Sequence, residues 1–146
     1  MNQNIYCLAR DGKRTVWDVR RLWALSAEFP VIDFEIETFT GLDIDMWFCG
    51  VNEPTVRAVY QHCLRIDAAD LAYPIMLDPD GLVIDGVHRL LKAKRRGLAA
   101  VSAVRFETMP APDRVEDWPP PAPASDPTTS GDSSAAPPCA RGRLAD

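Results

Sequence analysis

Two short apolar runs, separated by a tight turn, stand near the middle of the chain. Residues 74–77 form the first run and end at Asp78-Pro79-Asp80-Gly81, a sequence typical of a β-turn. Residues 82–84 form the second run, which is rich in β-branched side chains. The pattern predicts two buried strands joined by this turn.

A helical pattern follows these strands directly. Apolar residues recur at three- and four-residue spacing after Gly86, and Gly97 is a typical helix stop. We expect a helix between these two glycines and a closing strand at residues 100–106. Asp85 occupies the expected N-cap position, where a short carboxylate accepts hydrogen bonds from the first N–H groups of a helix.

The first thirty residues predict one strand and one helix. Residues 5–9 read as a strand that ends at the turn signal Asp11-Gly12. Thr15-Val16-Trp17-Asp18 resembles a capping box, with an acidic residue three positions after the threonine, and predicts a helix that Pro30 ends.

Residues 31–39 alternate between apolar and acidic side chains, which predicts a half-buried strand. In one interpretation the carboxylates keep an edge strand soluble and unpaired. In the other, Glu35 or Glu37 faces the basic helix that follows Gly86 and acts as a general base or a magnesium ligand.

A further helix is expected at residues 54–65, with Pro54 at an early position. The composition changes at Pro110, after which proline, alanine, serine and aspartate dominate. We therefore expect one domain at residues 1–109 and a disordered tail at residues 110–146, which is either a passive solubilising segment or a docking ligand. The predicted fold class is α/β (α+β), a small mixed sheet with about three helices.

The start of the central helix carries the candidate chemistry. His88 and Arg89 fall in its first turn, where unpaired N–H groups and the helix dipole favour an anion. Gly86 lets a ligand approach the backbone, and Lys92 adds positive charge one turn after His88. The pattern predicts a phosphate cradle in which Asp85 either caps the helix or holds Mg²⁺.

The order strand, Asp-Pro-Asp-Gly turn, strand, Asp-Gly-Val-His-Arg, helix, glycine and strand resembles the ParB/sulfiredoxin superfamily. The resemblance covers residues 70–107. In ParB proteins the corresponding box is Gly-Glu-Arg-Arg and in sulfiredoxins it is Gly-Cys-His-Arg, and both boxes bind nucleotide phosphates at a helix N-terminus. The resemblance implies that Gly86, His88 and Arg89 contact phosphate oxygens.

The departures from that superfamily restrict what the resemblance implies. Val87 stands where sulfiredoxins have their cysteine, so sulfinic acid reduction is not expected. The helix-turn-helix domain that follows the nucleotide-binding domain of segregation proteins is missing, so DNA recognition of that kind is not expected. Other members are kinases of small hydroxylated substrates or nucleases, and the residues do not select between them.

Composition and charge narrow the functional classes. The net charge of −5 disfavours a broad nucleic-acid surface, so we expect anion binding to be local to the basic helix. No run approaches the ~18 apolar residues of a membrane span, and the N-terminus lacks the layout of a signal peptide. The sequence therefore predicts a cytoplasmic protein without a membrane partner. Two histidines and four scattered cysteines disfavour a zinc site.

Three functional hypotheses follow. The first is a domain that binds a nucleotide or a phosphorylated small molecule, with Mg²⁺ as a candidate companion ion. The second is a non-catalytic interaction module whose basic helix, through Lys94, Arg95 and Arg96, docks an acidic partner or a nucleic-acid backbone. The third is a phosphoryl-transfer or nuclease-like enzyme with Glu35 or Glu37 as the base.

Overall fold

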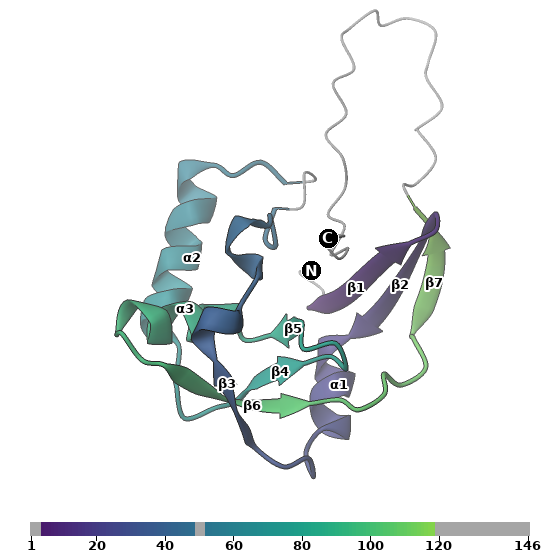
Figure 1. The fold of residues 1–146 in the computed structure, drawn as a ribbon. Helices are drawn as coiled ribbons and strands as arrows, with labels where there is room; N and C mark the ends of the chain where they lie inside the picture. The colour runs from purple at the N-terminus through teal and green to yellow at the C-terminus, as the bar shows by residue number, and fades with distance from the viewer. Residues whose placement is uncertain (1–3, 49–51, 119–146) are drawn as a thin grey trace, which may run out of the picture.

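The computed structural model describes residues 4–48 and 52–118 of the 146-residue chain (Figure 1). Within these residues the fold is α+β, with three α-helices and two β-sheets, and this confirms the predicted fold class. The sequence prediction of one mixed sheet missed the division into two. Residues 119–146 of the predicted tail lie outside the described residues.

The first sheet is antiparallel and has the strand order β1-β2-β7, with β1 at Ile5–Arg10, β2 at Lys13–Asp18 and β7 at Arg114–Asp117. Asp11 and Gly12 join β1 to β2 with φ angles of 51° and 73°, the left-handed conformation that a two-residue hairpin turn requires. The predicted strand at residues 5–9 is confirmed.

The predicted capping box is wrong. Thr15, Val16 and Trp17 belong to β2, because the tight turn returns the chain directly to β1 and the side chains of Val16 and Trp17 are buried. Helix α1 begins later, at Val19–Leu25. Its N-cap is Asp18, whose carboxylate accepts hydrogen bonds from the first N–H groups of the helix.

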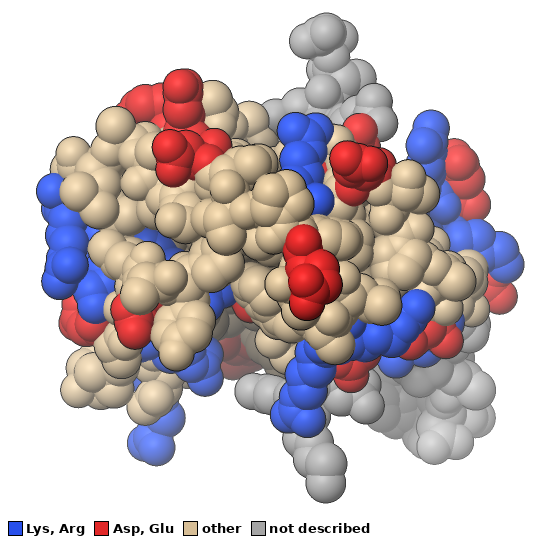
Figure 2. Space-filling view, turned by 90° about the horizontal axis from the view of Figure 1, so that it is seen from below, with Lys and Arg blue, Asp and Glu red and all other residues tan. Residues whose placement is uncertain are grey.

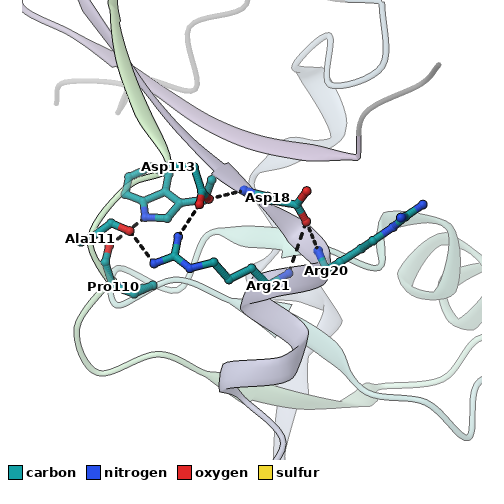
Figure 3. A network of polar contacts seen from close by, with 7 residues as sticks. Asp18, Arg20, Arg21, Pro110, Ala111 and Asp113 are labelled. Atoms are coloured by element: carbon teal, nitrogen blue, oxygen red, sulfur yellow. Dashed lines mark hydrogen bonds and ion pairs between the residues drawn. The ribbon is translucent and has the colours of Figure 1, made fainter.

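The folded part of the chain extends beyond the predicted boundary at residue 109. The carbonyl of Pro110 accepts a 2.8 Å hydrogen bond from Trp17 Nε1. Asp113 accepts a 2.8 Å hydrogen bond from the N–H of Asp18 and pairs with Arg21 at 2.8 Å (Figure 3). Strand β7 follows. The boundary prediction failed because β2 pairs with a segment whose proline-rich composition shows no apolar periodicity.

The second sheet has the order β3-β6-β4-β5, with β3 at Ile32–Glu35, β6 at Ala100–Arg105, β4 at Ile75–Leu77 and β5 at Val83–Asp85. Strands β4 and β6 are parallel, and the other neighbours are antiparallel. The predicted central strands are confirmed. The strand expected at residues 31–39 is only half that long, because the chain turns into the 3₁₀ helices η1 at Ile36–Thr38 and η2 at Gly41–Asp43.

Helix α3 spans Val87–Arg95 and connects β5 to β6. It ends as predicted at Gly97, whose φ is 71°. Gly97 N–H donates to the carbonyl of Lys94, and Leu98 N–H donates to the carbonyl of Ala93, the pair of bonds of a Schellman motif. The C-terminal boundary of this helix is therefore encoded locally.

Both faces of the second sheet are covered, and the alternation of side chains along its strands explains how. Met76, Ile84 and Val104 pack with α1 and the first sheet in one core cluster. Their neighbours Ile75, Leu77, Val83 and Ala103 pack with Leu90 and Ala93 of α3 in the other. A strand buried on both faces reads as a continuous apolar run, which is why these strands were visible in the sequence.

Helix α2 spans Val56–Ala68 and lies beside α3 at the edge of the molecule (Figure 1). Its N-cap is Thr55, which shifts the predicted start by two residues. Apolar residues along this helix, including Val56 and Tyr60, are exposed, whereas Ile66 near its end is buried. None of the helices in the described part of the chain has the length and apolar character that a membrane span requires.

Lys and Arg side chains are interspersed with Asp and Glu on the face shown in Figure 2. This face therefore presents no extended surface of positive charge.

Candidate functional site

The junction between β5 and α3 is built around Gly86. Gly86 is the N-cap of α3, is buried, and has a φ of 104°, which disfavours any residue with a side chain. A Cβ at this position would lie 2.7 Å from Cγ2 of Ile75 and 2.9 Å from an Nη atom of Arg89. No side chain caps the helix. The helix start is thus closely packed against Ile75 and Arg89, and no side chain caps it.

The side chain of Arg89 folds back over this helix start. Its guanidinium lies 3.4 Å from Oδ2 of Asp85 and 5.6 Å from the ring centre of Trp23 in α1. Arg89 is four-fifths buried, and its Nε has no hydrogen-bond partner among the described residues. The positive charge of Arg89 therefore lies beside the start of α3, which no side chain caps.

Asp85 does not cap α3, so this prediction is wrong. Asp85 is the last residue of β5, where it pairs with Met76. Its Oδ2 accepts a 2.9 Å hydrogen bond from Trp23 Nε1 and also faces Arg89. Because Gly86, in a left-handed conformation, takes the N-cap position, Asp85 remains in the strand. Its carboxylate orients the arginine instead.

No group of three or more His, Cys, Asp or Glu side chains is placed to hold a metal ion in residues 4–48 and 52–118. The role of Asp85 as a magnesium ligand stays a prediction.

His88 forms a pair with His62 of α2. The Nε2 of His88 lies 2.9 Å from Nδ1 of His62, so one hydrogen is shared between two imidazoles. The indole of Trp47 lies flat against both rings, with centroid distances of 4.0 Å to His62 and 5.1 Å to His88. Burial, with His62 and the positive charge of Arg65 as smaller causes, lowers the pKa of His88 to about 4. Near pH 7 His88 is therefore neutral and adds no positive charge to the helix start.

Lys92 points to the neighbouring helix. Its ammonium donates to the backbone carbonyls of Asp67 and Ala69, at 2.7 Å and 2.5 Å, at the C-terminal end of α2. Those carbonyls belong to the last turn and cap of the helix, where a cation is favoured. Lys92 thus holds α2 against α3, and the structure does not bring it to the phosphate cradle.

Glu35 and Glu37 lie near the other end of α3. Glu35 pairs with Ala100, the first residue of β6, and Glu37 lies 3.8 Å from Lys94. Because a helix rises about 1.5 Å per residue, Lys94 is roughly 10 Å along the axis from the helix start. The structure therefore does not bring these two carboxylates together with Gly86.

The basic end of α3 is partly neutralised. Lys94 faces Glu37, and Arg95 pairs with Asp67 at 2.7 Å. These contacts reduce the positive charge that an acidic partner or a nucleic-acid backbone would meet, so they count against the second sequence hypothesis.

A mostly apolar cavity of about 400 Å³ lies beside the helix start. Val87, the first residue of α3, and Leu91, one turn later, form one wall, and the segment of residues 39–48 forms most of the rest. The complete lining is Phe39, Gly41, Leu42, Ile44, Asp45, Met46, Trp47, Phe48, Pro54, Val87 and Leu91.

The sequence did not reveal the roles of Trp23, Trp47 and His62. Each lies more than twenty-five residues from the helix-start residue that it contacts, and tertiary packing alone brings them there. The local signal of the box around Gly86 indicated the candidate site, but not the aromatic residues around it.

No protein-family model matches the chain, and no curated protein or solved structure is similar to it. The interpretation of the site therefore rests on its geometry.

Proposed function

We propose that the protein binds a nucleotide or another phosphate ester, with a phosphate at the start of α3. One observation carries this proposal: the guanidinium of Arg89 lies beside the start of α3, 2.9 Å from the place of a Cβ on Gly86, and no side chain caps this helix. A helix N-terminus offers N–H groups and a partial positive charge, and an arginine supplies the charge-assisted hydrogen bonds that phosphate oxygens accept.

The unpaired Nε of Arg89 supports the same function. A buried polar atom without a partner costs free energy, and such atoms are rare unless a ligand or water satisfies them. A phosphate oxygen over Gly86 would be within reach of this side chain. The organic part of the ligand would lie in the cavity beside Val87, which begins where the helix begins.

The order of β4, β5, α3 and β6 supports a relationship to the ParB/sulfiredoxin superfamily as part of this proposal. The roles of the box residues differ from the resemblance in one respect. Gly86 and Arg89 take the proposed phosphate contacts, whereas His88 is a neutral partner of His62. With Glu35 and Glu37 at the far end of α3, the proposal concerns binding and not turnover.

Calorimetric titration of the full chain with ATP, CTP, GTP and ADP, with and without Mg²⁺, tests the proposal. Arg89→Met is the test variant, and Arg96→Met is its matched control because Arg96 is exposed at the C-terminal end of the same helix. We expect saturable binding that Arg89→Met weakens by about tenfold or more and Arg96→Met leaves nearly unchanged.

The result that contradicts the proposal is a folded wild-type chain that takes up none of these nucleotides. Equal weakening by both arginine variants would instead indicate nonspecific attraction by overall charge.

A further inference from the structure

We propose that the pair of His62 and His88, covered by Trp47, is a proton-controlled latch that holds residues 41–48 closed against α2 and α3. This inference goes beyond the proposed function and does not depend on it. It concerns a conformational equilibrium of the protein itself.

The latch joins three separate parts of the chain. His62 comes from α2, His88 from α3, and Trp47 from the segment that follows η2. The two imidazole planes differ by 9°, and the indole plane differs from each by 7°. The imidazoles thus form one flat hydrogen-bonded surface, and the indole covers both rings.

The stack anchors the end of the segment to both helices. Two of its hydrogen bonds are internal, since Ile44 N–H donates to the carbonyl of Gly41 and Phe48 N–H donates to Oδ1 of Asp45. These bonds maintain the local shape of the segment without tying it to the helices. Trp47 reaches both helices through the imidazole pair, and the edge of Phe48 meets the ring of His62. Release of Trp47 would also open the cavity that the segment lines.

Proton uptake opposes the closed arrangement. A first proton adds to an outer ring nitrogen, leaves the shared hydrogen in place and puts a charge in the partly buried pair. A second proton places hydrogens on both facing nitrogens and breaks the bond between them. In either step the imidazolium loses hydration, which it regains when the stack opens.

Some charged groups around the pair lower the pKa of His88, and one raises it. Arg65 of α2 and Arg89 of α3 disfavour a charge on His88, and Asp85 of β5 favours it. The segment contributes the carboxylate of Asp45, which accepts a bond from Phe48. Burial is the largest effect and lowers the pKa of His88 to about 4, and burial and Arg65 also lower the pKa of His62.

The sign of the pH effect follows from linkage. An open state in which His88 is hydrated has a pKa near 6.5, so it binds more protons than the closed state between pH 6.5 and pH 4. Acidification in this range therefore favours opening. From His88 alone, the ratio of open to closed molecules rises about tenfold between pH 7.5 and pH 5.5.

Nuclear magnetic resonance on the full chain measures both parts of the latch. His62 and His88 are the only two histidines of the chain, so their ring signals are assigned with a single His62→Gln variant. Relaxation dispersion of the indole nitrogen of Trp47 gives the population of the open state at each pH. Trp17 is an internal control, because it is buried in β2 of the first sheet and its indole N–H donates to the carbonyl of Pro110.

We expect His88 to titrate far below pH 6.5 and the open population seen at Trp47 to rise about tenfold from pH 7.5 to 5.5, while Trp17 stays unchanged. In His88→Gln the rise should be largely lost. The proposal is overturned if His88 titrates near 6.5, if Trp47 shows no pH-dependent exchange, or if Trp17 shows the same exchange, which would indicate unfolding of the whole domain. The wild-type titration decides the matter even if the variant does not fold.

Discussion

The hydroxyl of Tyr6 donates a 2.8 Å hydrogen bond to Oδ2 of Asp78, and this bond joins the two sheets of the protein. Tyr6 lies in β1, whereas Asp78 begins the turn between β4 and β5. Oδ1 of the same carboxylate accepts from the N–H groups of Asp80 and Leu82 within that turn. Asp78 is 2% exposed, so its charge is satisfied by these three donors in a site that water barely reaches.

Tyr6→Phe is expected to lower the free energy of unfolding by about 1.5–3 kcal/mol, because a buried carboxylate loses one of its donors. Urea denaturation of the two proteins measures the difference. Tyr60→Phe is the matched control, since the side chain of Tyr60 is exposed on α2 and the same atom is removed. Equal stabilities of Tyr6→Phe and wild type would show that the bond between the sheets contributes little.

Gly86→Ala and Gly97→Ala form a matched pair of substitutions. Both glycines have positive φ angles, of 104° and 71°, but a Cβ meets Ile75 and Arg89 at Gly86 and open space at Gly97. Gly97→Ala should cost only the strain of the left-handed conformation, about 1–2 kcal/mol. Gly86→Ala should cost more, because the packing must also shift, and it should displace Arg89 and weaken nucleotide binding.

Denaturation midpoints and nucleotide titrations of the two glycine variants check this prediction. A Gly86→Ala protein no less stable than Gly97→Ala would contradict the close packing behind the helix start.

Asp85→Asn should strengthen phosphate binding about fivefold, because the substitution removes a negative charge close to the bound phosphate. Repulsion between two like charges a few ångströms apart is worth ~1 kcal/mol in a hydrated site. An asparagine oxygen still accepts from Trp23, so the orientation of Arg89 is largely kept. Asp33→Asn, at an exposed position on β3, is the control for net charge. Weaker binding in Asp85→Asn than in the control would mean that the carboxylate acts as a ligand for Mg²⁺ or as the main support of Arg89.

A chain that ends at residue 109 should be less stable than one that ends at residue 118. The shorter chain loses β7, with the ion pairs of Arg14 with Glu116 and Lys13 with Asp117, and leaves the indole of Trp17 without the carbonyl of Pro110. Lost hydrogen bonds of about 1 kcal/mol each give an expected difference of about 2–4 kcal/mol.

Urea denaturation of the two shortened chains and the full chain measures that difference. Removal of residues 119–146 alone should change the stability by no more than about 0.5 kcal/mol, since this segment has no apolar periodicity to bury. A large loss on removing residues 119–146 would contradict the predicted tail.

The site was predicted where its signals are local and missed where they are not. Gly86 and Arg89 were singled out because the sequence Gly-Val-His-Arg at a helix start has a meaning in the sequence itself. The placement of Asp85 as an N-cap failed because the choice between two adjacent residues depends on how Gly86 packs against Ile75. Lys92 was misplaced because its partners are carbonyls of another helix.

By itself, the sequence determined the core strands β4, β5 and β6, the turn at Asp11 and Gly12, and the end of α3 at Gly97. These features depend on apolar runs and on backbone conformations that few residues adopt, so they are encoded within a few positions. Tertiary structure alone decided that residues 110–118 join the fold, that Glu35 and Glu37 lie far from the helix start, and that Trp47 covers the imidazole pair. Those outcomes depend on which distant surfaces meet, and no local pattern of residues carries that information.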